Sequence, residues 1–201
     1  MGINVDTNEI ARRLVHVSGV FFPLSYLLGL LSWRELGWVL IAVTLVAFCL
    51  EVVRLYVGLN WPLLERVFDR LTREYEQDNL AGYFLYLFGM AVVVLVFPPR
   101  SALAGMFMLA IADPVSGLLG SGELRAAKRT FVLLVTFGVS VLIASFLISP
   151  VPAVFGGLAA TIADGVKPAP GGYVIDDNLS IPVTSAVAMF LAIELLPSTP
   201  V

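Results

Sequence analysis

Long apolar runs separated by short polar segments dominate the hydropathy pattern of this chain. The runs cover residues 14–32, 36–57, 80–97, 101–119, 130–148, 151–163 and 181–196. A helix needs about 20 mostly apolar residues to cross the hydrocarbon core of a bilayer, and the first five runs come close to that length. The pattern therefore predicts an all-α, polytopic integral membrane protein with about seven transmembrane helices.

The segment 61–79 follows a different pattern. Its apolar residues recur at helical spacing, and charged residues occupy the opposite face. The apolar set is Leu63, Leu64, Val67, Phe68 and Leu71, and the charged set is Glu65, Arg66, Asp69, Arg70 and Arg73. This arrangement predicts an amphipathic helix that lies in the membrane interface.

The loop cations predict an orientation. Ten of the twelve Lys and Arg residues fall on one side of the membrane if the spans alternate in direction. They are Arg12, Arg13, Arg54, Arg66, Arg70, Arg73, Arg125, Lys128, Arg129 and Lys167, whereas Arg34 and Arg100 fall on the other side. Short loops rich in Lys and Arg stay in the cytoplasm. We therefore expect a cytoplasmic N-terminus and an external C-terminus.

The composition agrees with a membrane protein. Of the 201 residues, 59% are hydrophobic and 13% are charged, with a mean hydropathy of +0.93, whereas soluble domains carry about 25% charged residues. A net charge of −3 argues against a nucleic-acid partner, which would need a basic face. Residues 1–9 lack the features of a signal peptide, so we expect the first span to be retained. Without an obvious linker or repeat, residues 1–201 are expected to form one integral membrane domain.

The motif Asp176-Asp177-Asn178 immediately precedes the last apolar run. Paired carboxylates with a carboxamide beside them suit a Mg²⁺-bound polyphosphate, which needs hard oxygen ligands. Asp and Asn are also favoured at helix N-caps, and by itself the motif favours a cap. Polar residues elsewhere on the expected cytoplasmic side reverse this preference. They are His16, Glu51, the cluster 73–78, Asp113, Lys128 and Asp164.

Asp113-Pro114 lies inside the fourth apolar run, where an acid is a candidate for a functional role because its burial is costly. The proline disfavours helical backbone at Asp113, so we expect the helix to be interrupted there. Gly117, Gly120 and Gly122 follow and would let backbone amides approach a ligand. The Glu51–Arg54 pair has two equal interpretations, an internal ion pair at the interface or a part of the site.

Two further residues have a functional and a structural interpretation each. His16 could accept a proton near neutral pH or serve only as a helix-end residue. Lys128 could bind phosphate as a point charge, and it also anchors the cytoplasmic side.

In this order along the chain, the motifs resemble the CTP-dependent polyprenol and lipid kinases, a family that includes dolichol kinase, phytol kinase and CTP-using diacylglycerol kinases. The matching pieces are Arg12-Arg13-Leu14-Val15-His16, Glu51 with Arg54, Arg73 with Glu76 and Gly82, Ala112-Asp113-Pro114 with Gly117 and Gly120, Lys128 with Thr130, Asp164, and Asp176 to Pro182. The chain departs from the family where Phe131 follows Lys128-Arg129-Thr130 in place of Glu-Gly-Ser.

The resemblance implies transfer of the γ-phosphoryl group of CTP to the hydroxyl of an isoprenoid alcohol of the dolichol or polyprenol type, or of a related lipid alcohol, at the cytoplasmic face of a cell membrane or an endoplasmic-reticulum-type membrane. It implies Mg²⁺ as the cofactor, with Asp113, Asp164, Asp176, Asp177 and Asn178 as ligands. The implied catalytic residues are His16, Asp113, Lys128 and Asp177. The nucleotide would be held by Arg73, Gly117, Gly120, Gly122, Arg125, Lys128, Arg129, Thr130 and Asn178.

Two alternatives stay open. A CTP-using cytidylyltransferase of lipid phosphates would need the same Mg²⁺–CTP site but would release pyrophosphate. A small cation transporter would use the acids as ion ligands, although transporters more often place such residues near the membrane midplane between repeats.

Overall fold

The structure, a computed structural model, describes residues 7–57, 62–72, 76–120, 128–166 and 175–196. Regular secondary structure in this part of the chain is helical, and no strand occurs in it. The prediction of an all-α protein is therefore confirmed.

The helices follow the apolar runs of the sequence. In chain order they are α1 (Thr7–Ser18), α2 (Phe21–Leu27), α3 (Trp33–Val52), the π-helix η1 (Val53–Val57), α4 (Pro62–Leu71), α5 (Gly82–Val96), α6 (Pro99–Phe107), the π-helix η3 (Met108–Ala112), α7 (Asp113–Leu119), α8 (Thr130–Ser145), α9 (Pro150–Gly165) and α10 (Asp177–Leu195). By length and composition, three helical stretches in the described residues can cross a membrane: Trp33–Val57, Pro99–Leu119 and Asp177–Leu195. The apolar helices Gly82–Val96 and Thr130–Ser145 are shorter.

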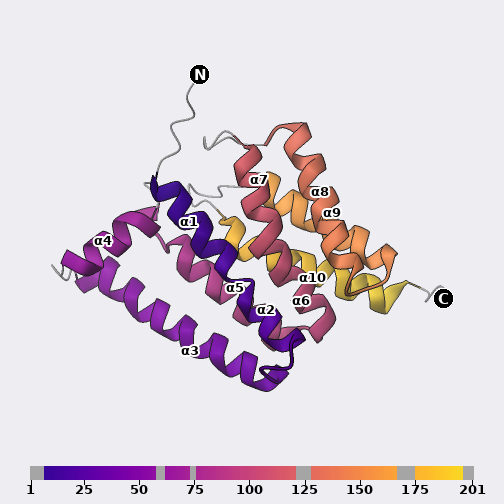
Figure 1. Ribbon diagram of the computed structural model, residues 1–201, viewed down its shortest axis with the longest axis horizontal. Coiled ribbons are helices and arrows are strands. Elements are labelled where there is room, and N and C mark those ends of the chain that lie inside the picture. The colour runs from indigo at the N-terminus through magenta and orange to yellow at the C-terminus, as the bar shows by residue number, and fades with distance from the viewer. Residues whose placement is uncertain (1–6, 58–61, 73–75, 121–127, 167–174, 197–201) are drawn as a thin grey trace.

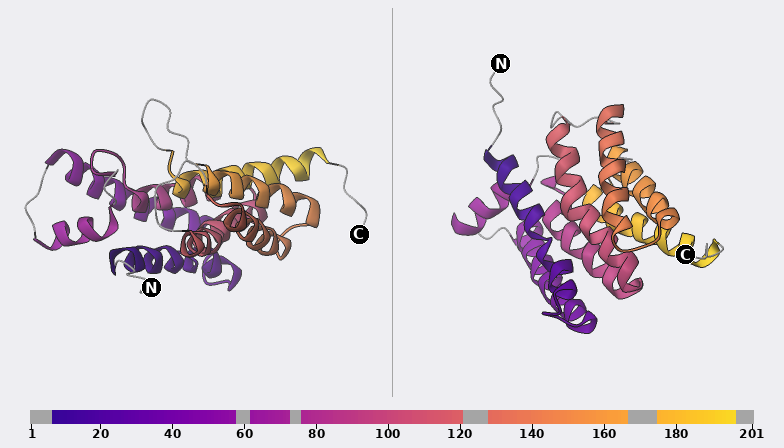
Figure 2. Two further views of the ribbon diagram at one scale, coloured as in Figure 1. Left: turned by 90° about the horizontal axis from the view of Figure 1, so that it is seen from above. Right: turned by 45° about the vertical axis from the view of Figure 1, so that its right-hand side comes forward.

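Helix α10 runs along one face of the bundle, as the left view of Figure 2 shows. It packs against α5, α6 and α9, while α8 covers α9 and α3 covers α5. Helix α1 contacts α4, α7 and η3, and α2 contacts α3 and α6. The N-terminal turn of α10, which carries the acidic motif, is thus surrounded by other helices.

Two glycines let the neighbouring helices approach α10 closely. A Cβ atom at Gly89 of α5 would lie 2.8 Å from the backbone oxygen of Asn178, and one at Gly105 of α6 would lie 2.7 Å from that of Pro182. Small residues at helix contacts in membranes allow such close backbone packing. The spacing fixes the start of α10 relative to α5 and α6.

The first apolar run forms two short helices instead of one span. Helices α1 and α2 are joined at Gly19 by backbone hydrogen bonds of the i→i+3 type, such as Gly19 N–H to His16 C=O at 3.1 Å. A side chain at Gly19 would overlap the ring and hydroxyl of Tyr86. The glycine is needed because Tyr86 of α5 donates a hydrogen bond to the His16 carbonyl at 2.7 Å.

The fourth run differs from its prediction, because the helix continues through Asp113-Pro114. Asp113 has helical backbone angles, φ −63° and ψ −50°. The π-helix η3 directly precedes it, and its wider turn accommodates a proline that lacks a backbone donor. The predicted break of the helix is therefore wrong: the chain changes from a π-helix to an α-helix at Asp113 without leaving helical backbone.

The amphipathic segment is shorter than predicted. Helix α4 spans ten residues, Pro62–Leu71, within the predicted range 61–79, and it packs against α1. Residues 76–79 form a turn instead of a helical extension. The backbone oxygens of this turn are bound by Arg54.

The Glu51–Arg54 pair fixes that turn. Arg54 donates to both carboxylate oxygens of Glu51, at 3.0 and 2.7 Å, and its remaining donors reach the backbone oxygens of Glu76, Gln77 and Asn79 at 3.2, 3.0 and 2.5 Å. Glu51 is 1% exposed. Its carboxylate also accepts from the Ala81 backbone N–H at 2.9 Å and from the hydroxyl of Tyr83. These contacts support the structural interpretation of the pair.

We predict that Arg54→Ala lowers the free energy of unfolding in detergent by about 3–5 kcal/mol, because it leaves Glu51 buried without its cation. Arg34→Ala is the matched control, since Arg34 is exposed near the other end of the same helix and should cost less than about 0.5 kcal/mol. Unfolding monitored by circular dichroism compares the two, and similar losses would contradict the assigned role.

Candidate functional site

Three carboxylates from three helices converge on one space. Asp113 begins α7, Asp164 lies in the last turn of α9 and Asp177 begins α10. One oxygen of each lies within 4.8 Å of the others. Asp164 and Asp177 are buried and Asp113 is partly buried. Burial of three acids so close together is costly unless cationic or hydrogen-bonding groups compensate their charge.

Lys128 compensates part of this charge. Its ammonium group lies 2.5 Å from Oδ1 of Asp164, whose side chain is fully buried, and it also donates to Ser116 Oγ at 2.9 Å. Ser116 in turn donates to Oδ2 of Asp164 at 2.5 Å. Because Asp164 lies at the C-terminal end of α9, where a negative charge opposes the helix dipole, the lysine is especially stabilising there.

His16 faces the same cluster from α1. Its Nε2 lies 3.2 Å from Oδ2 of Asp113. The imidazole packs edge-on against the ring of Tyr86 at a centroid distance of 4.3 Å, and the Tyr86 hydroxyl bonds the His16 backbone. The histidine is thus held by α5 and directed at the carboxylate of α7.

Arg13 ties α1 to α7. Its guanidinium donates to the backbone oxygens of Pro114 and Gly117, at 3.2 and 2.8 Å. A Cβ at Gly117 would lie 3.0 Å from Nη1 of Arg13, so the glycine leaves room for this contact. Arg13 thereby holds the turn of α1 that contains His16 against the turn of α7 that begins at Asp113.

Asp176 caps α10. Its Oδ1 accepts from the backbone N–H of Asn178 at 2.9 Å and from the side-chain amide of Asn178 at 2.6 Å. Asp176 and Asp177 are 5% and 4% exposed and Asn178 is 3% exposed, so the whole motif is buried. The cap and the acid cluster therefore use different residues of one motif.

The structure brings five of the predicted residues together: His16, Asp113, Lys128, Asp164 and Asp177. Arg129 and Thr130 are exposed at the start of α8. The backbone N–H of Gly120 donates to the oxygen of Ser116 at 2.9 Å and so completes the end of α7. Arg73, Gly122 and Arg125 lie outside the described residues.

Sequence reasoning did not single out Ser116 or Tyr86 and gave Arg13 no contact of its own. Ser116 lies three residues after Asp113, a spacing that places two residues on one helix face, so its position beside the acids had a signal in the sequence. No pattern in the sequence indicated the contacts that Tyr86 and Arg13 make with helices far along the chain.

The oxygen donors of the cluster suit a hard divalent cation. Mg²⁺ prefers carboxylate oxygens, and Asp113, Asp164 and Asp177 would supply three. The ammonium of Lys128 contacts Asp164, and the imidazole of His16 contacts Asp113. Three clustered carboxylates from three helices therefore fit a divalent cation by their chemistry.

Comparison with known proteins supports the family resemblance. The protein "CTP-dependent diacylglycerol kinase 1" of Schizosaccharomyces pombe is 25% identical over 92% of this chain and 93% of its own length. The protein of the same name from Saccharomyces cerevisiae is 22% identical over 94% of this chain and 75% of its own length. The resemblance to the CTP-dependent lipid kinases is confirmed. An uncharacterized protein of Rickettsia prowazekii is 25% identical over 88% of this chain and 90% of its length. No family model and no solved structure matches.

We predict that Lys128→Met lowers the free energy of unfolding by about 3–5 kcal/mol, because Asp164 then remains buried without its cation. The double variant Lys128→Met/Asp164→Asn should recover most of this loss, since no unpaired charge remains. Arg129→Met is the neighbouring exposed control. Unfolding of the wild type, Lys128→Met, Asp164→Asn and the double variant in a double-mutant cycle measures the coupling, and additive effects would contradict the pair.

Proposed function

We propose that this protein is a CTP-dependent lipid kinase that transfers the γ-phosphoryl group of CTP to the hydroxyl of a lipid alcohol. The observation that carries the proposal is the convergence of Asp113, Asp164 and Asp177 beside His16 in a chain that resembles such kinases. Phosphoryl transfer requires mainly positioning of the groups and neutralisation of phosphate charge. Buried acids that can hold Mg²⁺ meet the second requirement.

The residues have distinct roles in this proposal. Asp113, Asp164 and Asp177 would hold Mg²⁺, which when bound neutralises charge on the phosphates. Lys128 holds Asp164 in place through their ion pair, and its ammonium group would attract the phosphate tail as a point charge. The residues exposed at the start of α8, Arg129 and Thr130, would contact the nucleotide.

The reaction forms one bond and breaks one. The lipid hydroxyl oxygen attacks the γ-phosphorus, the bond from that phosphorus to the β–γ bridging oxygen breaks, and CDP leaves with the electron pair. The hydroxyl proton passes to the His16–Asp113 pair, whose 3.2 Å contact lets the carboxylate stabilise a protonated imidazole.

The acceptor is a long-chain alcohol. The names of the fungal relatives give diacylglycerol as their acceptor, and we extend the proposal to isoprenoid alcohols of the dolichol or polyprenol type. Both kinds present one hydroxyl on a large apolar body, which enters the site from the bilayer.

The proposal includes a topology of seven membrane crossings with a cytoplasmic N-terminus. Asp177 begins α10, Asp164 ends α9 and Lys128 precedes α8. The start of α8, the end of α9 and the start of α10 lie on the same side of a bundle in which consecutive helices are antiparallel. The excess of Lys and Arg on this side supports a site that faces the cytoplasm, where CTP is available.

The cytidylyltransferase alternative would use the same acids, and the names of the relatives favour the kinase. The products separate the two. A kinase releases CDP and leaves the γ-phosphorus in the lipid, whereas a cytidylyltransferase releases pyrophosphate.

The decisive assay supplies purified protein in detergent with Mg²⁺ and γ-labelled CTP or ATP. Geranylgeraniol, a polyprenol and dioleoylglycerol serve as acceptors. We expect the label to enter the lipid phase from CTP. Label transferred from ATP alone would contradict CTP as the phosphoryl donor. Release of pyrophosphate when lipid phosphates are supplied would favour the cytidylyltransferase over the kinase.

We predict that Asp177→Asn lowers the rate of transfer on the order of 100-fold or more, because it removes a carboxylate from the centre of the charge cluster. Glu194→Gln is the control, since Glu194 lies in the last turn of the same helix and outside the cluster. Initial rates at saturating CTP compare the variants. Wild-type activity of Asp177→Asn would refute the acid cluster as the reaction centre.

A further inference from the structure

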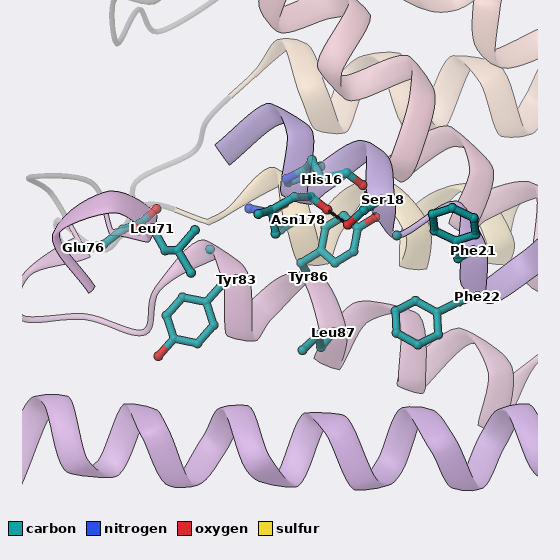
Figure 3. Close-up of a pocket in the computed structure, with 13 residues that line it drawn as sticks. His16, Ser18, Phe21, Phe22, Leu71, Glu76, Tyr83, Tyr86, Leu87 and Asn178 are labelled. Carbon is teal, nitrogen blue, oxygen red and sulfur yellow. Dashed lines mark hydrogen bonds between the residues drawn. The ribbon is translucent and has the colours of Figure 1, made fainter. Parts of the chain in front are cut away.

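A cavity of about 400 Å³ lies beside the acid cluster, between α1, α2, α4, α5 and the start of α10. Figure 3 shows His16, Tyr86 and Asn178 close together, with Phe21 and Phe22 on one side of them and Leu71 on the other. Most of the lining is apolar. Small-molecule sites have this size and this composition, an apolar wall with a few polar groups.

The cavity reaches the acid cluster through two of its lining residues. His16 lines the cavity and contacts Asp113 with its Nε2 atom at 3.2 Å. Asn178 lines the cavity and follows Asp177 directly in α10. A group bound between His16 and Asn178 is therefore adjacent to the carboxylates that we assign to the reaction centre.

Asn178 is a residue of the cavity wall that carries a hydrogen-bond acceptor. Its side-chain nitrogen donates to Asp176 at 2.6 Å, and because a carboxylate cannot donate, this contact fixes which end of the amide is the oxygen. That oxygen is buried and has no hydrogen-bond partner among the described residues. A buried acceptor without a donor is costly, so a ligand that carries an O–H group gains binding energy here.

Apart from Glu76, which lies at the Leu71 end of the cavity, the other lining residues suit an apolar chain. Val15 is 50% exposed and Phe21 is 71% exposed on the outer side of α1 and α2, and the exposed Ser18 lies between them. The hydroxyls of Ser18, Tyr83 and Tyr86 donate to protein oxygens. A chain of methyl and methylene groups therefore meets no competing donor from these three hydroxyls.

We propose that this cavity is the acceptor site, in which the lipid alcohol places its first carbons along Phe22 and Leu87 and its hydroxyl against Asn178 Oδ1 next to His16. The remaining chain leaves past Val15 and Phe21 into the bilayer. The inference rests on the proposed kinase function for the fate of the hydroxyl, and it assigns to Asn178 recognition of the lipid in place of a metal ligand.

The first test measures binding without turnover. A geranylgeraniol analogue with a diazirine near the hydroxyl is crosslinked to the purified full chain in detergent, in the absence of CTP, and the labelled peptides are identified by mass spectrometry. We expect labelling of α1 and α5 that excess unlabelled geranylgeraniol or dioleoylglycerol prevents. The competitor that acts at the lower concentration identifies the kind of alcohol. Protected labelling confined to other helices would overturn the assignment.

A second test narrows the cavity at its rim. Ser18→Trp places a bulky ring there, and exclusion of about two methylene groups should raise the KM for the lipid roughly tenfold, with the KM for CTP unchanged. Ser145→Trp is the matched control, because Ser145 is also an exposed helical serine whose hydroxyl bonds a backbone oxygen one turn earlier. Equal lipid KM values in the two variants would contradict the location of the cavity.

A third variant separates the two roles for Asn178. Asn178→Ala should weaken lipid binding in the crosslinking competition about tenfold, as expected for one lost hydrogen bond to a buried acceptor, while Mg²⁺–CTP binding by isothermal titration stays unchanged. The reverse pattern would return Asn178 to the metal site and overturn its role in lipid recognition. Because crosslinking needs no phosphoryl transfer, this arm tests the cavity independently of the proposed kinase function.

Discussion

The charge of the buried acids is the constraint on which the rest of the structure depends. Asp164 has no side-chain exposure and lies at the unfavourable end of a helix dipole. Its contacts with Lys128 and Ser116 join the start of α8 and the middle of α7 to the end of α9. Three helices are thus held together by the requirement that one carboxylate be neutralised, and the same requirement places Asp113 and Asp177 within reach.

A second buried acid has a different role. Glu51 is as deeply buried as Asp164, but Arg54, Tyr83 and the Ala81 amide supply it with a complete set of donors within the protein. Through Arg54 it fixes the turn that leads into α5. Glu51 therefore serves the fold, whereas Asp113, Asp164 and Asp177 share one space, an arrangement that suits a divalent cation. The gathering of several acids at one point separates the candidate reaction centre from the structural pair.

The candidate site lies where a lipid and a polar nucleotide can meet. His16 and Asn178 border both the acid cluster and the apolar cavity. The cavity is walled by α1, α2 and α5 on the side of the bundle away from α8 and α9 (Figure 1), while Lys128 approaches the acids from the α8 side. The two reactants proposed for this protein would therefore reach the same carboxylates from different directions.

The sequence by itself determined the helical class and the approximate ranges of most helices, because long apolar runs have few alternative explanations. It also named, as candidates, the three acids that lie close together in the structure. It did not determine that α6–α7 passes through Pro114, since the π-turn that permits this depends on packing. Nor did it separate Asp176, a cap, from Asp177, a member of the cluster. Only the tertiary structure decides that Asp177, and not Asp176, lies within reach of Asp113 of α7 and Asp164 of α9, because that direction depends on how α10 packs against its neighbours.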